Sequence, residues 1–143
     1  MSVLTAAPRS QTVRGALNIG GLATIAAGLG NLLALVIGRL AGADMSVLQP
    51  GATEAIEIGV VIVALGTVVP FALGTATLAL TTRWGRRGWT AVAWLGLAVG
   101  LLTTVSPFTV EASTSTSATL AAMHVVSGVV WFVLVRRSSS QPA

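Results

Sequence analysis

The sequence contains no cysteine, no lysine and no tyrosine, and only 8% of its residues are charged. The absence of cysteine excludes disulfide bonds, thiolate metal sites and thiol redox chemistry. A soluble domain of this size needs roughly 25% charged residues to cover its surface. Eight arginines and four acids cannot coat a water-facing globule. Because the mean hydropathy is +0.88, we expect most of the surface to face lipid.

What the sequence does contain is four long apolar runs, with no arginine or acid in the middle of any of them. They cover about residues 16–38, 56–80, 89–105 and 118–135. At 1.5 Å per residue each can cross a hydrocarbon core of about 30 Å, and helices satisfy the backbone within lipid. The pattern predicts an all-α fold, a four-helix transmembrane bundle over residues 16–135. Residues 1–15 are a predicted cytoplasmic arm and residues 136–143 a cytoplasmic tail.

The arginines predict how the chain is oriented. If the four runs alternate in direction, seven arginines lie on one side: Arg9, Arg14, Arg83, Arg86, Arg87, Arg136 and Arg137. Short arginine-rich loops stay in the cytoplasm, so we expect both termini inside. The Ala-rich, Gly-rich, lysine-free composition favours a bacterium, and hence the cytoplasmic (inner) membrane. Trp84, Trp89 and Trp131 fall near the ends of runs, which predicts interfacial anchors.

A cleaved signal peptide is the alternative for the first run. Two arginines precede it, and Ala41-Gly42-Ala43 resembles a cleavage site. The apolar run is about 23 residues long, however, whereas signal peptides have apolar regions of 7–15 residues. The length favours a retained membrane helix.

Small residues mark the predicted helix contacts. The first run carries them at intervals of 4, 3, 4, 3 and 4: Gly20, Thr24, Ala27, Asn31, Ala34 and Gly38. Such a seam lets another helix approach closely. Gly96 and Gly100 form a similar motif in the third run, and Pro70 predicts a kink in the second because it lacks an N–H group. Asn31 is either an interhelical packing contact or a polar lining residue of a ligand cavity.

His124 is the only histidine and lies in the fourth run. Ionisable residues within a membrane are candidates for function. Three interpretations compete: a neutral structural histidine, a proton-linked site, and a metal or haem ligand. Metal sites need several ligands, and the chain has no second histidine and no cysteine. We therefore predict no metal and no cofactor, and favour the structural role.

The remaining arginine, Arg39, lies on the side opposite the other seven, near the acids. An acidic partner explains such a position, and Glu57 or Glu111 is the predicted partner, with Asp44 as the alternative. Together with Asn31 and His124, these residues form the candidate polar site.

Several segments resemble those of a family of uncharacterised four-pass membrane proteins of actinomycetes, a domain of unknown function. The resemblance rests on residues 31–39 (NLLALVIGR), Val69-Pro70, the arginine-rich loop before Trp89 and Met123-His124-Val-Val. It spans nearly the whole chain. It implies the four-helix architecture and no established activity.

Three functions remain open. The favoured one is a non-enzymatic structural or accessory membrane component. The alternative is a small oligomeric transporter or channel subunit with an inward-facing polar site at Asn31 and His124. An enzyme using His124, Glu111 and Arg39 is disfavoured, because no nucleophile, base and orienting group share a recognisable spacing. Expected partners are membrane lipid and either a second copy or another membrane protein. Nucleic acid is excluded for want of a soluble basic surface.

Overall fold

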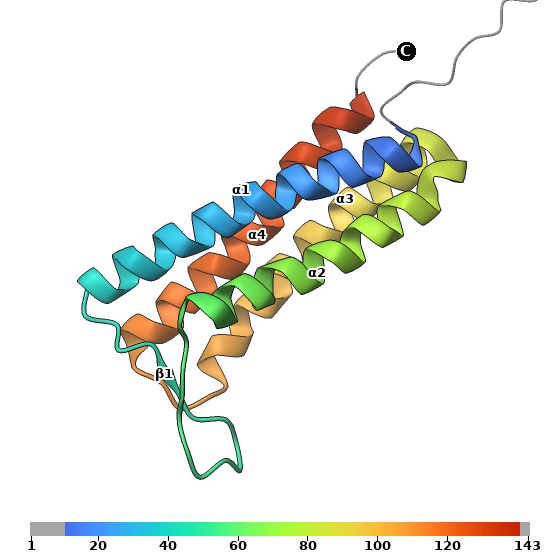
Figure 1. Ribbon diagram of the computed structural model, residues 1–143. Coiled ribbons are helices and arrows are strands. Elements are labelled where there is room, and N and C mark those ends of the chain that lie inside the picture. Colours follow the sequence, from blue (N-terminus) through green and yellow to red (C-terminus); the bar gives the residue numbers. More distant parts are fainter. Residues whose placement is uncertain (1–10, 141–143) are drawn as a thin grey trace, which may run out of the picture.

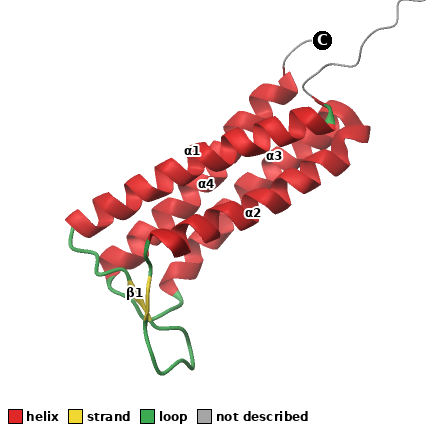
Figure 2. Ribbon diagram, in the orientation of Figure 1, coloured by secondary structure: helices red, strands yellow, loops and turns green. Residues whose placement is uncertain are grey.

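The computed structural model describes residues 11–140 and is almost entirely helical (Figures 1 and 2). Its α-helices are α1 (Val13–Leu40), α2 (Val60–Leu80), α3 (Gly85–Leu102) and α4 (Thr114–Ser140). Two 3-10 helices, η2 (Thr81–Trp84) and η3 (Thr103–Phe108), flank α3, and two short strands, β1 (Ser46–Val47) and β2 (Ile56–Glu57), lie between α1 and α2. The prediction of an all-α fold is confirmed. Arg9 lies outside the described residues.

Within residues 11–140, three helical segments are long and apolar enough to cross a membrane. They are Val13–Leu40, Val60–Phe108 and Thr114–Ser140. The middle segment contains α2, η2, α3 and η3 in uninterrupted succession. By helix length and hydropathy, the chain is a multi-pass membrane protein.

The middle segment bends back on itself at Gly85. Gly85 has a φ of +55°, a backbone conformation that glycine adopts without steric cost. At Gly88 the chain passes so close to the preceding turn that a Cβ would lie 2.6 Å from the Thr81 carbonyl oxygen. As a result α2 and α3 lie side by side in Figure 1, joined at the end near the C-terminus.

The packing around the bundle is uneven. α1 packs along α2 and α4, and α3 packs along α4, whereas α2 and α3 touch only sparsely. The seam of small residues on α1 lies at its contacts with both neighbours. A Cβ at Gly20 would meet the Thr75 side chain of α2, and a Cβ at Gly38 would meet the Thr119 side chain of α4. Ala27 is fully buried on the same face. Close approach of this kind maximises the van der Waals contact that holds membrane helices together.

The α1–α2 loop closes one end of the bundle. β1 and β2 pair antiparallel, with Ser46 opposite Glu57, and Leu48 forms a bridge with Glu111. This pairing removes Ile56 and Glu57 from α2, which begins at Val60 rather than at residue 56. The predicted second run was therefore too long at its start, since an apolar residue next to a helix is not distinguishable by hydropathy from one within it.

Asp44 fastens this loop to the start of α4. Its Oδ1 accepts a hydrogen bond of 2.7 Å from the Thr116 hydroxyl and one of 3.2 Å from the Ser46 N–H. The Thr116 hydroxyl is the main cause that lowers the pKa of Asp44 below the usual 3.8, and the Ser46 N–H adds to it. Because the charged form is the one that is stabilised, this contribution is present at neutral pH and is lost as the carboxylate is protonated in acid.

The prediction that Trp89 and Trp131 are interfacial anchors is wrong. Their side chains are 0% and 4% exposed, and both belong to the apolar core together with Phe71 and Leu78. Trp84 is 58% exposed, as an anchor requires. Position along a run does not tell which way a residue faces, and two tryptophans near the ends of runs point inward.

Candidate functional site: a cavity between the helices

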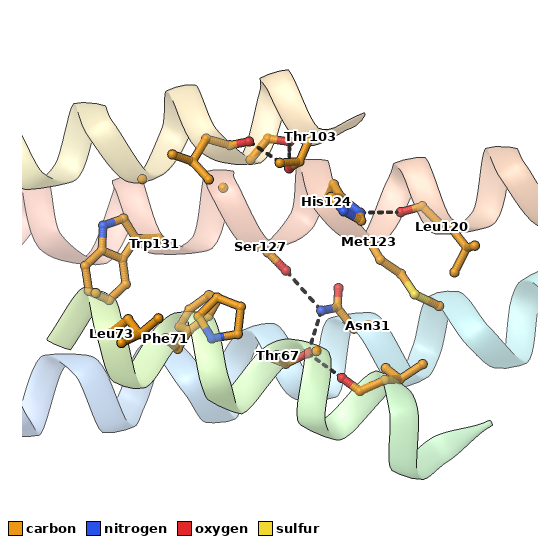
Figure 3. Close-up of a pocket in the computed structure, with 18 of the residues that line it drawn as sticks. Asn31, Thr67, Phe71, Leu73, Thr103, Leu120, Met123, His124, Ser127 and Trp131 are labelled. Carbon is orange, nitrogen blue, oxygen red and sulfur yellow. Dashed lines mark hydrogen bonds between the residues drawn. The ribbon is translucent and has the colours of Figure 1, made fainter. Parts of the chain in front are cut away.

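A cavity of about 580 Å³ lies between the helices and is lined by all four of them (Figure 3). Most of its wall is apolar, and the polar side chains that reach it are Asn31, Thr67, Thr77, Thr103, His124 and Ser127. Leu73 of α2 and Leu95 of α3 also line the cavity, yet they remain 67% and 58% exposed. The cavity therefore opens sideways between α2 and α3, the two neighbours that touch least.

Asn31 lies at the polar end of the cavity and joins three helices. Its Nδ2 donates a hydrogen bond of 2.9 Å to the Thr67 hydroxyl and one of 3.0 Å to the Ser127 hydroxyl. Thr67 in turn donates its own proton to the Val63 carbonyl at 2.8 Å. Because that proton is committed, the group facing Thr67 must be a donor, which fixes the orientation of the Asn31 amide.

This orientation leaves the other half of the Asn31 amide without a partner. Asn31 is only 4% exposed, and its Oδ1 has no hydrogen-bond partner. In Figure 3 the oxygen points away from Thr67, toward the side on which Met123 and His124 lie. A buried acceptor left unsatisfied costs about 1–3 kcal/mol, so the position favours a molecule that brings a donor to it.

His124 presents a second acceptor. Its Nδ1 lies 2.9 Å from the Leu120 carbonyl oxygen one turn earlier in α4. A carbonyl can only accept, so Nδ1 carries the proton, and in the neutral ring Nε2 is then an acceptor. Among residues 11–140 no hydrogen bond or ion pair joins this ring to an acid. No cluster of three or more possible metal ligands occurs there either.

A third acceptor is the Gly66 carbonyl, which Pro70 leaves without its helical donor. α2 continues through Pro70, which lines the cavity together with Gly66. Proline has no N–H, so the Gly66 carbonyl four residues earlier has no helical donor. The carbonyl of Gly66, Oδ1 of Asn31 and Nε2 of His124 thus belong to residues of the same cavity wall, and all three atoms accept hydrogen bonds.

The apolar end of the cavity is built around Trp131. Its ring lies beside Gly74 of α2 and Gly96 of α3, at contact distances that leave no room for a side chain at either position. Its Nε1 donates to the Val92 carbonyl at 3.1 Å, and the Phe71 ring meets it edge-on at 5.6 Å. These contacts hold α2 and α3 apart by the width of an indole ring.

The other predicted polar residues lie elsewhere. Arg39 pairs with Glu57 at 2.8 Å, but the two side chains are 45% and 73% exposed. An exposed pair of this kind contributes only about 0–1 kcal/mol. Glu111 is an exposed residue whose backbone pairs with Leu48. The structure therefore brings Asn31 and His124 to one cavity and separates them from Arg39, Glu57 and Glu111.

Thr67 and Gly66 lie beside Pro70 in the sequence, but nothing in the sequence shows that they share a cavity wall with Asn31. Thr67 lies three residues before Pro70. A threonine hydroxyl in a helix often bonds to a carbonyl of its own helix, as the Thr67 hydroxyl does to Val63. Its proximity to Pro70 was the one available signal, since a proline within a membrane helix can mark a binding site.

Comparison with known proteins gives one match. The model of a family of unknown function, DUF6069, matches residues 11–141. No curated protein and no solved structure matches the chain. The match covers most of the chain and agrees with the resemblance to a family without established activity.

Proposed function

Because the chain belongs to the DUF6069 family, whose function is unknown, we propose a function from the cavity: the protein binds an apolar small molecule carrying a hydrogen-bond donor, within the membrane and without chemical change. The observation that carries this proposal is the buried, unpartnered Oδ1 of Asn31 at the edge of a cavity of about 580 Å³. Volumes of 300–1,000 Å³ are typical of small-molecule sites.

The chemistry of the wall supports the choice of ligand. Asn31 Oδ1 and His124 Nε2 are acceptors, whereas Asn31 Nδ2 already donates to Thr67 and Ser127. A hydroxyl, amine or amide N–H of the ligand would satisfy Asn31 Oδ1 or His124 Nε2. The ring system or chain behind it would lie against Phe71 and Trp131. The opening between Leu73 and Leu95 gives access from the lipid, so that a lipid-soluble molecule has no need to cross water.

A topology accompanies the proposal. We propose four crossings, one by each α-helix, with the arginine-rich end and both termini in the cytoplasm of an actinomycete and the β1–β2 loop outside. The distribution of charge supports this orientation, because Arg14, Arg83 and Arg136 belong to one end of the bundle and all four acids lie outside the helices at the other. A second copy of the chain or another membrane protein is the proposed partner.

The proposal is tested by filling the cavity at a position that tolerates a side chain. Gly66 lines the cavity, and no atom lies within 4 Å of the place where its Cβ would be. Gly66→Phe should therefore fold but block the site. With the fluorescent amine 1-aminoanthracene as the probe, in lipid nanodiscs, we expect affinity to fall at least about tenfold, which corresponds to 1.4 kcal/mol.

The matched control is Gly21→Phe on α1. Gly21 is also helical and has no atom within 4 Å of its Cβ position, but it does not line the cavity. It should bind the probe as the parent does. Equal affinity of the parent and Gly66→Phe for the probe would refute binding in this cavity. If the parent does not bind the probe, the structural or accessory role becomes the favoured function.

A further inference from the structure

A groove between α3 and α4 gathers positive charge at the arginine-rich end of the bundle. It is lined by Arg86, Arg87, Thr90 and Ala91 of α3 and by Arg136 of α4. Arg136 Nη1 donates to the Thr90 hydroxyl at 3.2 Å, which holds its guanidinium group across the groove. None of these residues lines the cavity described above.

Among residues 11–140, none of these three arginines forms an ion pair. All four acids, Asp44, Glu54, Glu57 and Glu111, lie outside the helices at the opposite end, and within residues 11–140 the ion pair is that of Arg39 with Glu57. Arg86 and Arg87 also occupy the first turn of α3, where the helix dipole is itself positive, and no side chain caps that turn. A bound anion would therefore stabilise this end of α3.

One helical turn from the groove, toward the middle of the helices, lies an aromatic pair made of the exposed Trp94 and the partly buried Phe132. Trp94 follows Thr90 by four residues and Phe132 precedes Arg136 by four, so that each shares a helix face with its polar neighbour. The two rings are 4.6 Å apart between centroids. Trp94 is 55% exposed although it is a large apolar side chain in a membrane helix. The aromatic pair thus continues the same faces of α3 and α4 beyond the cationic groove.

We propose that this groove binds an anionic phospholipid, with its phosphate at Arg86, Arg87 and Arg136 and its acyl chains along Trp94 and Phe132. Guanidinium groups bind phosphate oxygens in pairs of hydrogen bonds, and basic pockets between membrane helices hold anionic lipid headgroups. The aromatic pair favours a lipid over free phosphate, because acyl chains pack against apolar rings whereas inorganic phosphate does not. The site does not depend on the function proposed for the cavity.

The test is native mass spectrometry from a neutral detergent, with dioleoyl phosphatidylglycerol, dioleoyl phosphatidylcholine and inorganic phosphate as probes. The parent should bind the anionic phosphatidylglycerol more tightly than the zwitterionic phosphatidylcholine. Each arginine that contacts the bound headgroup contributes a factor of about five to the lipid affinity. The triple variant Arg86→Gln, Arg87→Gln and Arg136→Gln should therefore lose affinity by roughly 100-fold, and excess inorganic phosphate should not displace the lipid.

The control variant removes the same charge from the same end of the molecule: Arg14→Gln, Arg83→Gln and Arg137→Gln, which do not line the groove. Its affinity should stay within about threefold of the parent. A second variant, Trp94→Leu with Phe132→Leu, should weaken lipid binding with all arginines in place. Equal losses in the two arginine variants would overturn the groove in favour of general charge. Displacement by inorganic phosphate would overturn the lipid as the occupant.

Discussion

Gly100→Leu should lower the free energy of unfolding by about 3 kcal/mol, at the upper end of the range for overpacked sites. A Cβ at position 100 would lie 2.7 Å from the Cα and 3.0 Å from the amide nitrogen of Gly128, and 3.0 Å from the His124 carbonyl oxygen. These are backbone atoms, which cannot rotate away as a side chain can. The helices α3 and α4 would have to separate along their length. Reversible unfolding in mixed micelles of neutral detergent and dodecyl sulfate measures the change.

Gly28→Leu is the matched control for this prediction. Gly28 lies within α1, and a Cβ there would have no atom within 4 Å. The same substitution should change the unfolding free energy by no more than about 0.5 kcal/mol, as surface changes usually do. If the two variants unfold alike, the backbone contact between α3 and α4 is absent from the protein in detergent.

Trp131→Ala should be the other severe change, with a loss of about 3–5 kcal/mol, the usual range for truncating a buried tryptophan. The indole is 4% exposed, donates to the Val92 carbonyl and lies between Gly74 and Gly96. Its removal leaves a void between α2 and α3 and removes the hydrogen bond to the Val92 carbonyl. The two glycines have no side chains with which to close the gap, so the neighbouring helices must shift or leave it empty.

Trp84→Ala serves as the control, because Trp84 is 58% exposed and stacks with Arg83 at 4.8 Å rather than with the core. Its unfolding free energy should stay within about 0.5 kcal/mol of the parent. A parent-like stability of Trp131→Ala would show that the indole does not separate α2 from α3.

The sequence predicts the helices well and the faces of the helices only in part. The apolar runs identify α1 to α4 because hydrocarbon requires about 20 apolar residues per crossing. The regularly spaced small residues of α1 indicate a close contact because small side chains let two helix backbones approach each other. Trp89 and Trp131 were misplaced because hydropathy is nearly uniform around these helices. When every face is apolar, the pattern no longer distinguishes lipid from core.

The cavity depends on information that a single sequence does not carry. It exists because Trp131 holds α2 and α3 apart and because Gly74 and Gly96 admit its ring on both sides. Asn31 and His124 were selected as rare polar residues in apolar runs, and both lie on its wall. Their common position follows from how α1 and α4 are rotated, and an unpartnered oxygen is visible only when the partners of the rest of the amide are known.

The central claim is that the cavity selects an apolar ligand for its hydrogen-bond donor. It is tested most directly by comparing 1-aminoanthracene with anthracene, which has the same ring system and no donor. Affinities are measured in nanodiscs and expressed as mole fractions in the lipid. We predict that the parent protein prefers the amine by about tenfold, the equivalent of one net hydrogen bond of 1.4 kcal/mol. Asn31→Leu, which removes the unpartnered Oδ1, should abolish the preference, whereas equal affinity of the parent for the two compounds would contradict the account.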